Sequence, residues 1–239
     1  MKKVCRPVYC VLLFLMVCFT MPSVSHAGET GRQRTIMVYM CGSNLESSYG
    51  SASADMQEML DADYDTASTT VLLMTGGSSF WFSGYPADKT SIVELGKKRT
   101  RVVWSDDALD MGEPETLTRF LQYGMETCPA EEYALVLWNH GGGPLEGVCW
   151  DELFSMDSLS LSELTSALEQ AGLPGKLSWI GFDACLMGCA EVASAVSPYA
   201  DYMIASQETE PAKGWNYSFL NGIEKDRSGA ETGRRIVDS

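Results

Sequence analysis

Four apolar runs constrain the fold of this chain more than any other feature. Each is apolar along its whole length and is followed directly by glycine or by a short polar segment. A strand that is apolar on both faces must be covered on both faces, which is typical of parallel sheets flanked by helices. The sequence therefore predicts an α/β fold with a mostly parallel central sheet, whose main strands are Thr35–Cys41, Thr69–Thr75, Tyr133–Trp138 and Leu177–Phe182.

The segments between these runs predict the helices of such a fold. Capping residues and an apolar stripe at helical spacing favour helices at four places, together with a hairpin and a short fifth strand. The 239 residues, with 45% apolar and 21% charged side chains, are sufficient for one large domain or two small ones. The expected helices are Glu113–Thr127, Ser160–Gln170, Leu186–Val196 and the second half of Glu46–Ala62; the hairpin joins Ser91–Leu95 to Arg101–Trp104, and the fifth strand is Asp201–Ala205.

The N-terminus has the pattern of a secretory signal peptide. Basic residues Lys2, Lys3 and Arg6 precede the apolar run Val11–Met21, and Ser25-His26-Ala27 offers small residues before a cut. The run is too short to span a bilayer, although an uncleaved anchor is an alternative. We therefore expect residues 1–27 to be removed and residues 28–239 to form one domain, truncated at its C-terminus. The protein would be exported, extracellular or periplasmic, without stable membrane insertion after signal removal.

Charge and ligand-type residues narrow the function further. The formal charge of −15 disfavours binding to nucleic acid or anionic membranes. The negative charge is compatible with binding of calcium or of a basic substrate. Aspartates and glutamates from Asp106 to Glu115 could bind calcium, but their spacing matches no EF-hand loop, so a solvated acidic turn is the favoured interpretation. Beyond the signal the only histidine is His140, which excludes a multi-histidine zinc site.

Two predicted strands end in reactive residues, His140 and Cys185. Neighbouring parallel strands lie about 5 Å apart, and ligands bind beyond their carboxyl ends. The imidazole could therefore take the thiol proton, and the expected helix after Cys185 would favour the thiolate. The backbone N–H groups of Gly141 and Cys185 could form an oxyanion hole. The alternatives are a core cysteine, a structural histidine and a simple glycine turn.

Longer motifs around these residues resemble a known family. Tyr133–Gly143 (YALVLWNHGGG) and Ile180–Cys189 (IGFDACLMGC) are similar to the histidine and cysteine motifs of clostripain-like cysteine peptidases, of the caspase-hemoglobinase clan. The resemblance extends roughly from Thr35 to Tyr217. It implies a caspase-like α/β/α sandwich, with Cys185 as the nucleophile, His140 as the catalytic histidine and Gly141 as an oxyanion donor.

The resemblance also implies cleavage after Arg or Lys. In it, Asp183 matches an acidic residue that lines the pocket for the residue before the cut (P1), although Asp183 could instead cap the following helix. Glu208 and Glu210 follow the fifth strand and could add negative charge to the pocket. Family members often cut themselves after the histidine motif, but Gly141–Gly175 contains no Lys or Arg, so we expect this loop to remain intact.

The sequence thus predicts a secreted cysteine endopeptidase that acts on protein or peptide substrates. An inactive homologue or binding module of the same fold is the first alternative. An α/β-hydrolase esterase, in which His-Gly-Gly-Gly would be an oxyanion loop, is the second. The esterase is disfavoured because the chain contains no G-x-S-x-G nucleophile motif.

Overall fold

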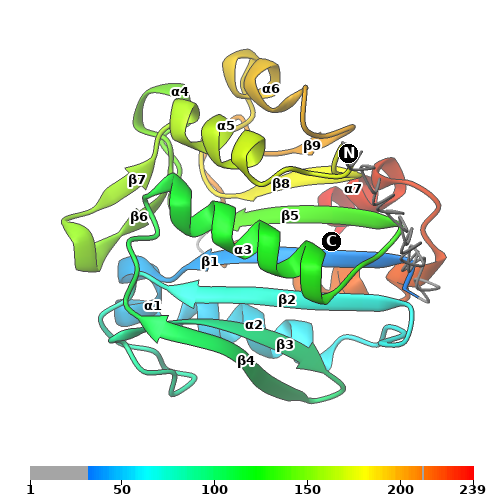
Figure 1. Ribbon diagram of the computed structural model, residues 1–239, viewed down its shortest axis with the longest axis horizontal. Coiled ribbons are helices and arrows are strands. Elements are labelled where there is room, and N and C mark those ends of the chain that lie inside the picture. Colours follow the sequence, from blue (N-terminus) through cyan, green and yellow to red (C-terminus); the bar gives the residue numbers. More distant parts are fainter. Residues whose placement is uncertain (1–31, 212) are drawn as a thin grey trace, which may run out of the picture.

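A seven-stranded sheet forms the centre of the computed structural model, which describes residues 32–211 and 213–239 (Figure 1). The predicted signal peptide lies outside the described residues. The strand order is β4-β3-β2-β1-β5-β8-β9. The pairs β2–β3 and β3–β4 are antiparallel and the other four neighbouring pairs are parallel, so the predicted mostly parallel sheet is confirmed. The strands are β1 (Arg34–Cys41), β2 (Thr69–Gly76), β3 (Lys89–Gly96), β4 (Arg99–Asp107), β5 (Glu132–Trp138), β8 (Trp179–Asp183) and β9 (Met203–Ile204).

Helices cover both faces of this sheet (Figure 1). Helices α3 (Pro114–Thr127), α5 (Leu161–Gln170) and α6 (Ala190–Val196) lie on one face, and α2 (Ser51–Asp61) and α7 (Gly229–Asp238) lie on the other. Two shorter helices, α1 (Ser43–Tyr49) and α4 (Gly143–Glu146), follow β1 and β5 at the carboxyl edge of the sheet. A separate hairpin of β6 (Val148–Asp151) and β7 (Asp157–Leu159) lies at the same edge.

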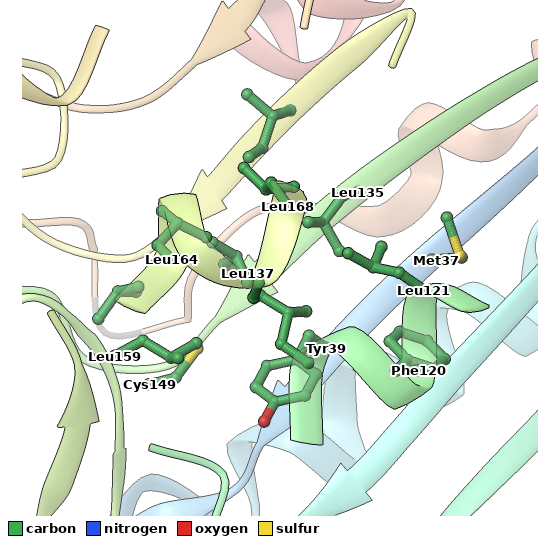
Figure 2. Close-up of a cluster of buried hydrophobic side chains, with 14 of the residues drawn as sticks. Met37, Tyr39, Phe120, Leu121, Leu135, Leu137, Cys149, Leu159, Leu164 and Leu168 are labelled. Carbon is green, nitrogen blue, oxygen red and sulfur yellow. The ribbon is translucent and has the colours of Figure 1, made fainter. Parts of the chain in front are cut away.

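Alternation along β1 shows why its apolar run requires two covering layers. Successive side chains of a strand point to opposite faces, so Met37 and Tyr39 pack under α3 whereas Ile36 and Val38 pack under α2. All four are at most 1% exposed. Figure 2 shows the first of these two cores, in which Tyr39 lies beside Phe120 of α3. Burial on both faces makes the sheet a rigid platform for the loops at its ends.

Three local features differ from the sequence prediction. The region Glu46–Ala62 forms two helices, because Gly50 adopts a left-handed φ of 67° that ends α1 and begins α2. The β6–β7 hairpin was not predicted, since its strands are short and partly polar. The last predicted helix starts at Ala190 and not at Leu186. Among the described residues, none of the helices has the length and apolar character needed to cross a membrane.

Candidate active site

The ends of β5 and β8 bring the two predicted reactive residues together. Trp138 and Asp183 are register partners and the last residues of these strands, and His140 and Cys185 each follow two residues later. Both residues line one cavity of about 220 Å³. A Cβ atom added to Gly141 would lie 2.2 Å from the carbonyl oxygen of Cys185, so the two loops are in direct backbone contact. The predicted pairing of the two strand ends is therefore present.

His140 is oriented by a side chain that sequence reasoning missed. Its Nε2 atom lies 2.7 Å from Oδ1 of Asn44, at the start of α1. Since an amide oxygen can only accept, Nε2 carries the proton and Nδ1 is left with its lone pair. The ring also lies beside Trp150, with 5.6 Å between centroids, and burial lowers the pKa of His140. The bond to Asn44 thus fixes the orientation of the ring, with Nε2 as the donor, and burial disfavours the charged imidazolium.

The loop that carries His140 is itself fixed to two other segments. The buried Asn139 side chain donates to the carbonyl of Cys41, at the end of β1, over 2.6 Å and accepts from the N–H of Trp150 over 2.8 Å. The N–H of Cys149 also donates to the carbonyl of His140. These bonds join β1, β5 and the β6–β7 hairpin, so the histidine loop has little freedom to move.

Cys185 lies in a tight turn and not at a helix N-terminus. Leu186 has a φ of 63°, in the left-handed region, and its N–H donates to the carbonyl of Glu208. The N–H of Gly188 likewise donates to the carbonyl of Ser206. These bonds direct the backbone away from a helical path, and α6 begins only at Ala190. The expectation that a helix dipole favours the Cys185 thiolate is therefore wrong.

The sulfur of Cys185 accepts a hydrogen bond from the backbone. The backbone N–H of Glu210 points at the sulfur, with 3.3 Å between N and Sγ. Cys185 and Cys189 are half-buried, and no disulfide joins the five cysteines in the described part of the chain. The other three thiols are buried, namely those of Cys41, Cys128 and Cys149.

Two backbone N–H groups of the reactive loops have no hydrogen-bond partner among the described residues. Across the described residues, neither Gly141 N–H nor Cys185 N–H donates a hydrogen bond within the protein. The bridge between Gly141 and Val148 uses only flanking groups, through Gly142 N–H and Cys149 N–H. Both predicted oxyanion donors are therefore available to a ligand.

Asp183 lies in the wall of the same cavity and is 4% exposed. Its carboxylate accepts from Tyr217 Oη over 3.0 Å and from Trp215 N–H over 3.1 Å. It is therefore not the N-cap of α6, and the alternative interpretation as a helix cap is wrong. Burial raises the pKa of Asp183 to about 7, although both hydrogen bonds act to lower it. A carboxyl group with such a pKa changes charge near neutral pH.

Two further acids surround Asp183. Glu210 lines the cavity, and burial raises its pKa. Asp55 of α2 is 3% exposed and accepts from Trp138 Nε1 over 2.7 Å; burial, followed by the charge of Asp183, raises its pKa to about 8. The exposed Glu208 is not among the lining residues, so the structure places Glu210 and not Glu208 at the cavity.

The acidic region considered for calcium divides into separate parts. Asp107 pairs with Lys89, whereas Asp110 and Glu113 meet Asp157 of β7, with carboxylate oxygens within 4.8 Å of one another. Burial raises the pKa of Asp110 to about 6. These three carboxylates could hold a hard cation, which would be bound well outside the cavity residues described above.

The sequence is similar to those of known proteins. The model of the clostripain family matches residues 38–239. Clostripain from Hathewaya histolytica is 26% identical over a region that covers 81% of this chain and 42% of that protein.

Solved structures are similar as well. A secreted C11 cysteine protease from Bacteroides thetaiotaomicron, bound to an irreversible peptide inhibitor, has a TM-score of 0.71 and 21% identity, covering 87% of this chain and 57% of that one. An inactive zymogen C11 protease from Parabacteroides distasonis has a TM-score of 0.66 and 25% identity, covering 87% and 56%. This chain thus spans about half the length of these relatives.

The fold, the paired strand ends and the family match lead to one assignment. The expected caspase-like α/β/α sandwich is confirmed by the likeness to the C11 protease structures. The match to the family model extends over most of the described residues and includes both reactive loops. The chain belongs to the clostripain family.

Proposed function

We propose that this chain is the catalytic part of an exported cysteine endopeptidase that cuts after Arg or Lys. One observation carries the proposal. The carboxyl ends of two parallel neighbours, β5 and β8, present an oriented imidazole and a half-buried thiol to one cavity that also contains a buried carboxyl group. An imidazole beside a thiol is the minimal arrangement for covalent acyl transfer.

The proposed reaction uses the tautomer that Asn44 imposes. Nδ1 of His140 takes the proton from Sγ of Cys185, and the sulfur attacks the carbonyl carbon of the peptide bond. The negative charge that forms on the carbonyl oxygen is stabilised by the N–H groups of Gly141 and Cys185. His140 then gives its proton to the departing amine, which leaves a thioester on Cys185. Water, deprotonated by His140, hydrolyses this thioester and restores the thiol.

The acids of the cavity support a preference for a basic P1 residue. A guanidinium or ammonium group that enters the cavity would meet the Asp183 carboxylate in a site shielded from water, where charge-assisted hydrogen bonds are strong. Glu210 would add a second negative charge at the rim. Bound cation and ionised carboxylate stabilise each other, so binding would lower the pKa of Asp183 again.

A second candidate, a binding module without catalysis, is favoured by one contact. The backbone N–H of Glu210 donates a hydrogen bond to Sγ of Cys185, so the segment that carries Glu210 lies directly beside the proposed nucleophile. In such a module the cavity would bind a basic side chain without cutting the chain that carries it. The two functions differ in the reactivity of Cys185, which can be measured directly.

The test uses full-length protein and fluorogenic peptides with Arg at P1. Cys185→Ala should abolish hydrolysis, a loss of at least about 1,000-fold, because no other group can form the thioester. The matched control is Cys189→Ala, which removes the other half-buried thiol and should remain active. Retention of activity within tenfold in Cys185→Ala would refute the nucleophile. Slow alkylation of Cys185 in the wild type, with no hydrolysis, would support the binding module.

A further inference from the structure

Three exposed aromatic side chains lie beside the cavity, at the same edge of the sheet. Tyr49, at the end of α1, is 77% exposed; Phe80 and Phe82, in the loop between β2 and β3, are 54% and 58% exposed. The two phenylalanine rings pack edge to face, with 5.0 Å between their centroids. Large apolar side chains gathered on a surface mark a site of interaction. We call these three residues the aromatic shelf.

The loop that carries the shelf is held by two carboxylates. Glu46 of α1, which is fully buried, accepts from Phe82 N–H over 2.7 Å and from the backbone and hydroxyl of Ser53. Glu152 accepts from the N–H of Ser79 and the hydroxyl of Ser47. Burial of a carboxylate is costly unless it is hydrogen-bonded in this way. The fold therefore fixes the loop while leaving its two phenylalanines in solvent, and rigid aromatic side chains lose little entropy on binding a partner.

The shelf is continuous with the cavity. Leu45 and Ser51 line the cavity, and Tyr49 and Gly50 lie between them in the chain. Leu45 and Tyr49 are four residues apart and so lie on the same side of α1. A Cβ atom on Gly50 would lie 3.1 Å from the ring of Phe82, so that ring packs directly on the turn after Tyr49. An apolar surface thus runs from the cavity wall to the shelf.

We propose that the aromatic shelf is a second subsite, which binds a large apolar side chain of the peptide substrate outside P1. The proposal rests on the proposed function, since it needs a peptide bound across the cavity. One helical turn spans about 5.4 Å and an extended chain about 3.3 Å per residue. The side chain in question is therefore about two residues from P1. Specificity would then combine an acidic pocket with an apolar shelf.

The first measurement is hydrolysis by full-length protein of Arg-P1 peptides that carry Phe or Gly at each flanking position in turn. At one position, about two residues from P1, Phe should raise kcat/KM about tenfold, as expected for partial burial of an apolar side chain. In the Phe80→Ala/Phe82→Ala variant, the ratio of kcat/KM for the Phe peptide to kcat/KM for the Gly peptide should fall close to one. The Phe80→Tyr/Phe82→Tyr variant should restore this ratio. An unchanged ratio in the alanine variant would overturn the proposal.

Because Phe82 packs on Gly50, a second variant guards against loss of folding. Tyr49→Ala removes a mostly exposed ring and should reduce the same ratio. Its matched control is Tyr202→Ala, which removes an exposed aromatic side chain next to the amino end of β9, at the opposite edge of the sheet, and should leave the ratio as it is. Equal effects of the two variants would contradict the assignment.

A binding measurement separates failure of the shelf from failure of the proposed catalysis. Fluorescence anisotropy with Cys185→Ala protein needs no hydrolysis. The Phe peptide should bind about tenfold more tightly than the Gly peptide, and the difference should disappear in the Phe80→Ala/Phe82→Ala background. A shelf that covers a second copy of the chain would instead give a dimer that the alanine variant dissociates, with no difference between the peptides. That result would also overturn the proposal.

Discussion

The histidine side and the cysteine side of the site begin from equivalent positions but are supported differently. His140 and Cys185 each lie two residues beyond paired strand ends. His140 donates a hydrogen bond to Asn44, and the bonds of Asn139 fix its loop to β1 and the β6–β7 hairpin. Cys185 instead depends on residues 206–211, whose backbone groups bond to its turn and its thiol, and on Tyr217 and Trp215, which hold Asp183.

This difference in support suggests that the histidine side and the cysteine side have different roles in the proposed reaction. The histidine side fixes one proton acceptor in one orientation, and it is built from neutral groups. The cysteine side combines the proposed nucleophile with buried acids whose pKa values lie near neutrality, so its charge depends on pH. Damage to the first side should lower the rate for every substrate. Damage to the second should, in addition, alter which substrates are preferred.

The largest expected effect comes from the histidine side. His140→Ala should lower kcat at least about 1,000-fold for basic and neutral P1 residues alike, because the described chain offers no other imidazole to accept the thiol proton. It should also slow alkylation of Cys185 by iodoacetamide. If alkylation keeps its wild-type rate, His140 does not activate the thiol, and the proposed pairing is wrong.

A smaller and selective effect is expected from Asp183→Asn. Loss of the buried negative charge should lower kcat/KM for Arg-P1 peptides about 100-fold, with little change for peptides that have a neutral P1 residue. A panel of peptides that differ only at P1 measures the ratio of kcat/KM for Arg-P1 peptides to kcat/KM for neutral-P1 peptides. An equal loss for all P1 residues would assign Asp183 a structural role and not a role in specificity.

The same variant should change the pH profile. The Asp183 carboxyl is neutral below its pKa of about 7, so wild-type kcat/KM for Arg-P1 peptides should rise as pH increases through that value. In Asp183→Asn the rise should shift to the lower pH at which His140, whose pKa burial lowers, gives up its proton. A wild-type profile that is the same for Arg and neutral P1 residues would contradict this assignment.

The smallest effect is expected from Asn44→Ala. Loss of one neutral hydrogen bond to Nε2 should lower kcat about tenfold for all substrates and leave the P1 preference unchanged, because the imidazole loses its fixed tautomer and orientation but keeps its basicity. The measurement is kcat and KM for the same peptide panel. Asn44→Asp, which keeps the acceptor, should recover much of the rate. A changed P1 preference would show that the two sides are not independent.

Sequence patterns predicted the sheet and the juxtaposition of the strand ends because both depend on local properties. Runs such as Tyr133–Trp138 are apolar on both faces, and the crossover through α5 makes β5 and β8 neighbours. The turn after Cys185 could not be predicted in this way. Its sequence is compatible with a helix, and only pairing with the distant Ser206 and Glu208 carbonyls prevents one.

Asn44 and Asp55 were missed for a related reason. Asn44 lies in the short polar segment after the first apolar run, and only the parallel pairing of β1 with β5 brings it to His140. Asp55 has the spacing of an ordinary helical residue, and its burial depends on its bond to Trp138. A search for polar residues just beyond the ends of adjacent predicted strands would have found Asn44, but not Asp55.

The strand order also determines when during biosynthesis the site can form. The chain builds the sheet outward from β1 to β4, then returns to place β5, β8 and β9 on the other side. A domain generally folds as a unit, and its N-terminal segments are synthesised first. The half of the sheet that lacks both reactive residues is therefore synthesised first. Trp215 and Tyr217, which donate hydrogen bonds to Asp183, are synthesised after both reactive loops. The proposed catalytic site therefore cannot be complete until the chain has been made as far as Tyr217.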